Sequence, residues 1–185
     1  PKQSNDHFPF KHLCGCGVGF KFMQGWAKNN GIPFSRLIPL LDFCAVAIAA
    51  DIVPVTEENR ILAFHGLKQL NQNPNIGLKA IIDICGLNGR ELSMSDIVFK
   101  IGPRINASGR MESGKESVDL LIEKDYNCAL QKAKHIDEYN EQRKDIDKQM
   151  TEEANQIVAK IESQKHYSSI VLYDENWKKG VIGIV

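Results

Sequence analysis

The residues best suited to chemistry lie in the run 97–111, Ile-Val-Phe-Lys-Ile-Gly-Pro-Arg-Ile-Asn-Ala-Ser-Gly-Arg-Met. Polar side chains recur there at every second position, namely Arg104, Asn106, Ser108 and Arg110. Side chains at this spacing leave the same face of an extended backbone. The run therefore predicts one face that carries guanidinium, amide and hydroxyl donors suited to phosphate or carboxylate oxygens. The alternative is a solvated polar loop whose arginines pair with nearby acidic residues.

The element that must position these donors is predicted from the same run. Ile97, Phe99 and Ile101 alternate with other residues, which is typical of a short strand, and Gly102-Pro103 predicts the turn that ends it. Gly109 would let the backbone come close to a bound group. We therefore expect a strand followed by an extended loop, which is either an anion site or a solvated polar loop.

A carboxylate ends the most apolar stretch of the chain. Residues 34–52 predict a helix that is nearly all apolar from Leu40 on, as a helix buried on all sides would be. Asp51 is costly in such a place unless it is paired, capped or bound to a cation. Either the 53–56 turn or Arg60 satisfies it, or it is a ligand for a hard divalent cation. The residues alone favour the structural role.

A long helix is predicted from residue 125 to about residue 163, because this stretch contains no Pro or Gly and is amphipathic. Its inward stripe is apolar at both ends, but Asn140, Arg143 and Asp147 occupy the middle of it. Either the middle is solvated between two lobes, or it faces a polar cleft between them. In both cases the helix connects two domains. The Ile-Val-Leu-Tyr run within residues 168–173 then predicts a buried strand that begins the second one.

Composition limits the functions open to this chain. Lys+Arg and Asp+Glu are both 23, so there is no global basic field, and affinity for nucleic acid must come from a local patch such as Arg104 and Arg110. This argues against a general DNA-coating protein. The longest apolar run, residues 43–50, is too short to span a bilayer, and we expect a cytoplasmic protein. The start at Pro1 and the apolar end at residues 180–185 predict a fragment of a longer protein.

The five cysteines have no disulfide-framework spacing. Cys44, Cys85 and Cys128 lie in apolar or helical contexts and predict buried, reduced thiols. Cys14 and Cys16 are the only close pair. With His12 as the single nearby imidazole, they are weak evidence for a zinc site.

Five collinear motifs resemble the DHH phosphoesterase family, and within it the single-stranded-DNA-specific exonucleases. They are Phe-Pro-Phe-Lys-His-Leu-Cys-Gly-Cys-Gly-Val-Gly-Phe-Lys (8–21), Ala-Asp-Ile-Val-Pro-Val-Thr-Glu-Glu-Asn-Arg (50–60), Ile-Gly-Pro-Arg-Ile-Asn-Ala-Ser-Gly-Arg-Met (101–111), Asn-Glu-Gln-Arg-Lys (140–144) and Trp-Lys-Lys-Gly-Val-Ile-Gly-Ile-Val (177–185). Together they extend over the whole chain, and their shared order makes the resemblance far more specific than any one motif.

The resemblance implies an α/β fold in three parts: the helix-rich C-terminal part of a DHH catalytic domain at residues 1–124, a connecting helix at 125–163, and the start of a DHH-associated domain at 164–185. It implies that the parent protein hydrolyses phosphodiester bonds of single-stranded DNA from the 5′ end, in DNA repair and recombination. A pair of Mn²⁺ or Mg²⁺ ions in the cleft between the lobes would supply the catalysis.

The resemblance also implies roles for single residues. Asp51 matches the last metal-ligand carboxylate of the DHH domain, which reverses the preference for a structural role. Arg104, Asn106 and Arg110 match a loop that faces the cleft and are expected to contact DNA phosphates. Ser108, also in that loop, stands where the family usually has Ala.

On the connecting helix, Asn140 and Arg143 match a motif whose role is either substrate contact or positioning of the lobes. The Asp-x-Asp motif and the Asp-His-His triplet of the family are absent, and Asp6-His7-Phe8 lacks the second His. With Asp51 as the sole recognisable ligand, we expect the fragment alone to be inactive. Two other functions stay open: a DHH-family phosphoesterase acting on small nucleotides, and a noncatalytic scaffold that binds an anionic partner.

Overall fold

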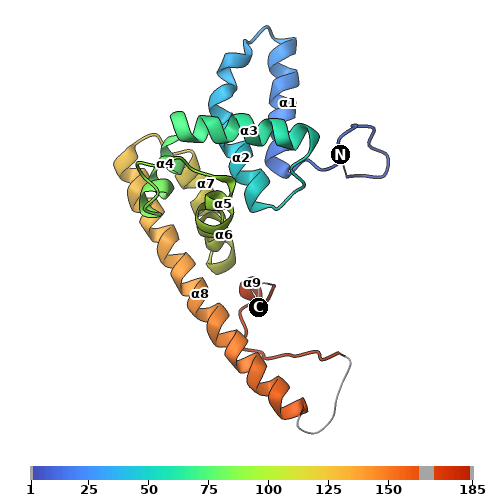
Figure 1. Cartoon of the computed structure of the whole chain (residues 1–185), viewed down its shortest axis with the longest axis vertical. Helices are drawn as coiled ribbons and strands as arrows, with labels where there is room; N and C mark the ends of the chain where they lie inside the picture. The colour runs from blue at the N-terminus through green and yellow to red at the C-terminus, as the bar shows by residue number, and fades with distance from the viewer. Residues whose placement is uncertain (1, 163–168, 184–185) are drawn as a thin grey trace.

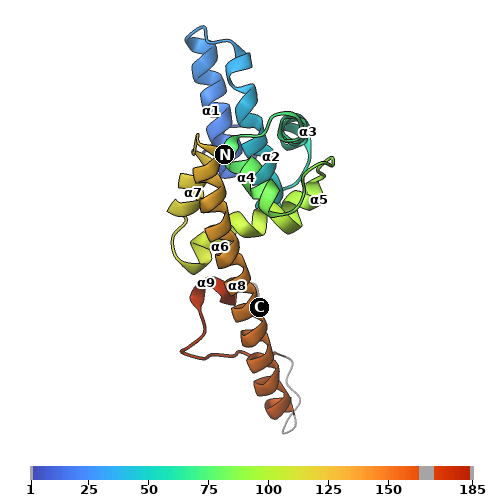
Figure 2. The same ribbon diagram turned by 90° about the vertical axis from the view of Figure 1, so that its left-hand side faces the viewer.

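The computed structural model describes residues 2–162 and 169–183 (Figure 1). These residues form helices joined by loops, and no strand occurs among them. The predicted α/β fold is therefore wrong for the described part of the chain. A helical body carries one long helix, α8 (Tyr126–Glu162), which extends far beyond it, and α9 (Lys179–Ile182) returns to lie beside this extension (Figures 1 and 2).

The remaining elements precede α8 in the chain. They are α1 (Gly15–Asn29), the 3₁₀ turns η1 (Phe34–Arg36) and η2 (Ile38–Leu40), α2 (Leu41–Ala50), α3 (Glu57–Gln72), α4 (Ile76–Ile84), α5 (Met94–Asp96), the π-helical turn η3 (Ile97–Ile101), α6 (Gly102–Met111) and α7 (Lys115–Leu121). Helices α1 and α2 lie side by side, and α3 crosses α2 (Figures 1 and 2).

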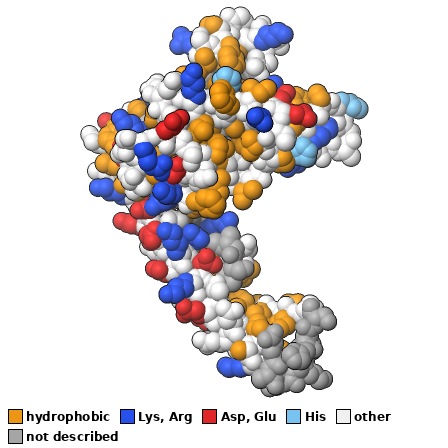
Figure 3. All heavy atoms as spheres, in the orientation of Figure 1, with side chains coloured by type: hydrophobic (Ala, Val, Ile, Leu, Met, Phe, Trp, Pro, Cys, Tyr) orange, Lys and Arg blue, Asp and Glu red, His pale blue; other side chains and the backbone are white. Residues whose placement is uncertain are grey.

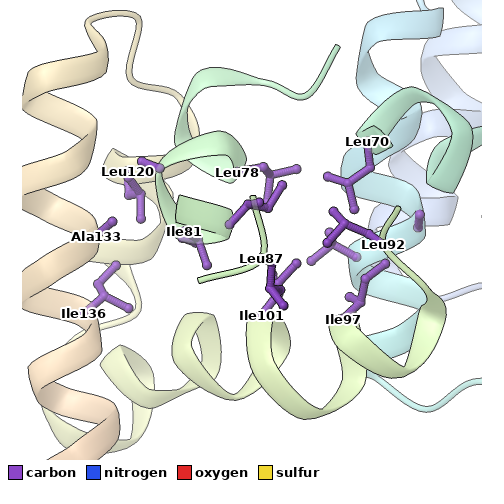
Figure 4. Close-up of a cluster of buried hydrophobic side chains, with 14 of the residues drawn as sticks. Leu70, Leu78, Ile81, Leu87, Leu92, Ile97, Ile101, Leu120, Ala133 and Ile136 are labelled. Carbon is purple, nitrogen blue, oxygen red and sulfur yellow. The ribbon is translucent and has the colours of Figure 1, made fainter. Parts of the chain in front are cut away.

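Two buried hydrophobic clusters hold the body together. One joins α1, α2 and α3 and includes Phe20, Cys44 and Ile48. The other joins α2, α4, η3, α7 and the first turns of α8, and it includes Ile81, Ile101, Leu120 and Ile136 (Figure 4). Full burial of each large apolar side chain contributes about 1.5–3 kcal/mol. The near half of α8 is thus fixed to the body, whereas the far half is not part of either cluster.

Gly66 sets how closely α3 crosses α2. An ideal Cβ built on Gly66 would lie 2.1 Å from the carbonyl oxygen of Leu41. No larger residue fits there unless the two helices separate. The close crossing fixes the position of α2, whose last turn leads into Asp51.

Residues 97–111 are helical, so the predicted strand, turn and extended loop are all wrong. A capping box begins the helix: the Asp96 N–H donates to the Ser93 hydroxyl (3.3 Å), and the Ser93 N–H donates to the Asp96 carboxylate (3.0 Å). From α5 the chain continues through η3 into α6. Pro103 lies near the start of α6 but inside this continuous helical run, just beyond the π-helical turn, where the regular hydrogen-bond pattern is already interrupted.

The predicted long helix is confirmed by α8. Of the predicted strand at 168–173, residue 168 lies outside the described residues, and residues 169–173 have no regular secondary structure. The predicted domain boundary at 163/164 also lies outside the described residues. Within residues 2–162 and 169–183, none of the helices combines the length and the apolar character needed to cross a membrane.

Candidate functional site

A cleft of about 300 Å³ lies between the end of α2, α6 and α8. Its apolar side is formed by Ala49, Ala50 and Ile52 at the end of α2. The polar side chains that line it come from the other two helices: Asn106 and Arg110 from α6, and Arg143 and Asp147 from α8. Residues predicted from two separate motifs are therefore brought to one place.

The helical form of α6 divides the predicted row of donors into two pairs. Successive helical residues are rotated by about 100°, so alternate positions point to nearly opposite sides, and positions four apart share a face. Asn106 and Arg110 face the cleft, whereas Arg104 and Ser108 do not line it. The prediction that all four share one face is wrong, because it assumed an extended backbone.

Arg104 is held by the near half of α8. Its Nε donates to Oδ1 of Asp137 at 2.7 Å, and its Nη1 donates to the carbonyl of Lys100 at 2.9 Å. The Arg104 side chain is only 16% exposed. The Asp137 carboxylate balances the charge of this guanidinium, which is the arrangement expected of an arginine that joins two helices.

Ser108 is fully buried between α6 and α7. Its Oγ lies 2.7 Å from the Oγ of Ser117, and the Ser117 hydroxyl lies 2.7 Å from the carbonyl oxygen of Ile105, so Ser117 can donate to this carbonyl while Ser108 donates to Ser117. Because the hydroxyls satisfy each other inside the protein, Ser108 contributes to the packing of α7 against α6.

Arg110 has a different kind of partner. Its Nη1 donates to the backbone carbonyl of Gly180 at 3.0 Å. Among the described residues, no carboxylate lies within salt-bridge distance of Arg110. A carbonyl is a dipole without net charge, so it orients the guanidinium but does not neutralise its positive charge.

The polar middle of α8 forms the opposite wall of the cleft. Arg143 Nη1 lies 3.6 Å from Oδ2 of Asp147, and Arg143 Nη2 donates to Oδ1 of Asn140 at 3.3 Å. Asn140 is completely buried, and its amide also donates to Glu141. Asn140 therefore orients Arg143 from beneath, and Arg143 and Asp147 present the charges to the cleft.

Asp51 lies at the C-terminal end of α2, and its side chain is exposed. Its carboxylate has no hydrogen-bond or ion-pair partner among the described residues, so neither the 53–56 turn nor Arg60 satisfies it. The next residue, Ile52, has φ +50°, a left-handed conformation that is strained for a β-branched side chain. Asp51 lines a separate hollow with Cys14 and Val18, while Ile52 lines the cleft.

The buried carboxylate of α2 is Asp42, near the other end of the helix. It accepts hydrogen bonds from the backbone N–H of Asn75 (2.7 Å) and from the Asn75 side-chain amide (2.8 Å). Burial raises the pKa of Asp42 above its usual range, against these hydrogen bonds. The argument that Asp51 is a buried carboxylate was therefore wrong, and it applies to Asp42.

A two-metal site requires several ligand side chains close together. Within residues 2–162 and 169–183, no group of three or more His, Cys, Asp or Glu side chains could hold a metal ion. The five cysteines are free thiols; Cys44 is buried as predicted, Cys85 is half-buried, and Cys128 is exposed, contrary to the prediction. Asp51 offers one unpaired carboxylate, so these residues alone do not fit a two-metal site.

The surface around α8 carries charges of both signs. Acidic and basic side chains are interspersed along the exposed part of this helix on the face shown in Figure 3. Two ion pairs illustrate the mixture, Lys144 with Glu141 at 2.7 Å and Lys148 with Glu152 at 4.0 Å. On this face, the helix does not form a basic track.

No protein-family model matches the chain. Two curated relatives match its full length: the single-stranded-DNA-specific exonuclease RecJ of Escherichia coli is 32% identical over 197 residues, and that of Bacillus subtilis is 36% identical over 185 residues. The chain resembles RecJ throughout. It spans 34% of the E. coli RecJ and 22% of the B. subtilis RecJ.

A solved structure of RecJ agrees with this resemblance. The crystal structure of RecJ in complex with Mn²⁺ from Thermus thermophilus is 26% identical and superposes with a TM-score of 0.77. The match covers 93% of this chain and 25% of that RecJ chain. The resemblance predicted from five motifs is confirmed, and the arrangement of helices described above is that of the corresponding segment of RecJ.

Proposed function

We propose that this chain is a segment of a metal-dependent exonuclease that hydrolyses single-stranded DNA from its 5′ end, in DNA repair and recombination. The observation that carries the proposal is the cleft, in a chain that resembles RecJ, where Arg110 and Arg143 from different helices face the same space. The RecJ relatives are named as single-stranded-DNA-specific exonucleases. A cytoplasmic location and the division into residues 1–124, 125–163 and 164–185 belong to the same proposal.

The cleft is proposed to bind a phosphate group of the DNA strand. Arg110 and Arg143 would donate to phosphate oxygens, and the Asn106 amide would complete the set of donors. The proposal does not extend to Arg104 and Ser108, because their present contacts with Asp137 and Ser117 do not support a phosphate contact. These two residues instead hold α6 in place.

Asp51 is proposed as one ligand of Mn²⁺ or Mg²⁺, and the complete site requires further ligands from outside the described residues. Three observations support this role: the carboxylate is unpaired, it lies at the negative end of the α2 dipole, and the adjacent Ile52 is strained. The unpaired carboxylate and the helix dipole favour a bound cation, and the strained backbone at Ile52 is of the kind found at functional sites. When bound, such metal ions stabilise the charge on the attacking and leaving oxygens.

The test is digestion of a 5′-phosphorylated single-stranded oligonucleotide by the full-length parent in the presence of Mn²⁺, beside its Asp51→Asn variant. We expect the parent to digest the strand and the variant, still folded, to lose at least about a hundredfold in rate. Asp145→Asn is the matched control, because Asp145 is an exposed carboxylate on α8 that does not line the cleft. Equal activity of the Asp51→Asn variant would contradict the metal-ligand role.

The same assay separates the alternatives. The balance of 23 basic and 23 acidic residues is compatible with a phosphoesterase for small nucleotides, which needs no basic channel. A parent that leaves the strand intact but cleaves dinucleotides would favour that function. Inactivity on both substrates would favour the noncatalytic scaffold. We expect the 185-residue chain by itself to be inactive, because it has too few metal ligands.

A further inference from the structure

The segment from Trp177 to Ile182 is seated in the angle between α6 and the far half of α8. Trp177 Nε1 donates to Oε2 of Glu153 on α8 at 2.9 Å, and Lys178 Nζ donates to the carbonyl of Met111 at 3.0 Å. Val181 is fully buried. The segment therefore has one polar anchor on each helix and an apolar anchor between them.

Gly180 touches Arg110 in two ways. An ideal Cβ built on Gly180 would lie 2.2 Å from the carbonyl oxygen of Arg110 and 3.0 Å from its carbonyl carbon and Cα, so any side chain would force the segment away. The carbonyl of Gly180 accepts the hydrogen bond from Nη1 of the same arginine. The backbone approach that only glycine permits thus places the carbonyl that orients the guanidinium.

This contact suits an anion site because it leaves most of the N–H donors of the Arg110 guanidinium available. A guanidinium has five N–H donors, and one of them is used by the Gly180 carbonyl. The carbonyl fixes the direction of the side chain and adds no negative charge that would compete with a phosphate. A guanidinium held in advance loses less conformational entropy when the anion binds.

We infer that Gly180 is a positioning residue for Arg110, so that the segment from Trp177 to Ile182 completes the phosphate site of the cleft. The inference rests on the proposed function, since it specifies how the proposed phosphate contact is held. It assigns the C-terminal segment a part in binding, although none of its residues lines the cleft.

The experiment measures binding of a 5′-phosphorylated oligothymidylate, labelled with a fluorophore at its 3′ end, to the 185-residue chain by fluorescence anisotropy. We expect Gly180→Ala to weaken binding about tenfold, the loss expected for one charge-assisted hydrogen bond. Gly183→Ala is the matched control, because a Cβ there meets nothing within 4 Å. It should bind as the unsubstituted chain does.

A double-variant cycle distinguishes positioning from a general structural role. If Gly180 acts through Arg110, then Gly180→Ala should add no further loss in an Arg110→Gln background. The seating of the segment is read independently from the emission of Trp177 in a Trp26→Phe background, which removes the other tryptophan of the chain. Gly180→Ala should shift this emission to the red, and Gly183→Ala should not.

The outcomes separate the inference from the proposed function. If Arg110→Gln weakens binding but Gly180→Ala does not, or if the two losses multiply, the inference is wrong and the phosphate site stands. If the unsubstituted chain does not bind the oligothymidylate, or Arg110→Gln binds equally well, the phosphate site itself is wrong and the inference falls with it. An equal loss in Gly183→Ala would mean general disruption of the segment and would also overturn the inference.

Discussion

Arg104 and Arg110 lie on the same helix, α6, yet their partners differ in charge. Arg104 bonds to the Asp137 carboxylate at 2.7 Å, whereas Arg110 bonds to the Gly180 carbonyl at 3.0 Å. The first contact forms a charge-balanced bridge between α6 and α8. The second leaves a positive charge at the edge of the cleft. Of the two arginines of α6, only Arg110 therefore keeps a positive charge that no carboxylate partner balances.

The largest effect that tests this comparison is on oligonucleotide affinity. We expect Arg110→Gln combined with Arg143→Gln to weaken binding of a 5′-phosphorylated oligothymidylate by about a hundredfold, since each removes a charge-assisted contact. The dependence of affinity on salt should also become shallower, because fewer phosphate charges are neutralised. Anisotropy titrations at several salt concentrations measure both. Arg104→Gln is the control, and a loss in this variant as large as in the double variant would invalidate the comparison.

The next effect is on stability and concerns Arg104. We expect Arg104→Gln to lower the free energy of unfolding by about 1–3 kcal/mol, because it leaves the half-buried Asp137 carboxylate without its partner. Urea unfolding of Arg104→Gln, Asp137→Asn and the double variant measures the coupling between the pair. The exposed pair Lys144–Glu141 on α8 provides a reference cycle with a coupling near zero. Strict additivity at Arg104 and Asp137 would show that the bridge adds nothing.

A smaller effect is expected at Ser108. Ser108→Ala should cost about 1 kcal/mol of stability, because Ser117 retains its hydrogen bond to the Ile105 carbonyl. The same variant should bind the oligothymidylate unchanged. Thermal unfolding and anisotropy on one preparation measure the two quantities. Weaker binding at unchanged stability would place Ser108 in the phosphate site after all.

The smallest effect is on the pH dependence of stability and concerns Glu123, whose carboxylate pairs with the Lys132 ammonium. The Lys132 ammonium and the backbone N–H groups of Asp125 and Lys124 hold the pKa of Glu123 at about 2, below its usual 4.5. A carboxyl with a depressed pKa stabilises the fold above the unfolded value, and this contribution is lost as the pH falls from about 4.5 to about 2. Unfolding midpoints across this range should fall less steeply in Glu123→Gln than in the unsubstituted chain. Identical slopes would exclude the contribution.

The long helix could be predicted because its signals are local and repeated. An uninterrupted run without Pro or Gly, with apolar residues at helical spacing, determines α8 without reference to the rest of the chain. Its polar middle was also visible in the sequence. What could not be predicted was which of the two explanations holds, because the cleft at Arg143 and Asp147 depends on how α6 packs against α8.

The run 97–111 was predicted wrongly because short apolar runs fit a strand and a buried helix equally well. Alternation of Ile97, Phe99 and Ile101 suggested a strand, and Gly102-Pro103 suggested a turn. The opposing signal was present upstream, where Ser93 and Asp96 form the capping box of a helix. Pro103 lies seven residues beyond Asp96, and the structure accommodates it inside the helical run, just after the π-helical turn η3.

The candidate site was only partly predictable. Arg110 and Arg143 could be identified because each lies in a recognisable motif. Asp137, Ser117 and Gly180 were missed, because what they do depends on partners far away in the sequence or on an approach of two backbones. The prediction that Asp51 is buried was also wrong, because the apolar run before it does not show at which residue the helix leaves the core.

The contacts made by the far half of α8 depend on the number of residues in this helix. Arg143 in the cleft and Glu153 beneath Trp177 lie on one continuous helix, about 15 Å apart along its axis. Insertion of a single residue between them would rotate Glu153 by about 100° around the axis and turn it away from Trp177. Insertion of about seven residues would restore its direction but move it about 10 Å along the axis, away from α6. Point substitutions in this stretch are therefore tolerable where insertions and deletions are not. Helix α8 fixes both the distance and the relative rotation between Arg143 and Glu153.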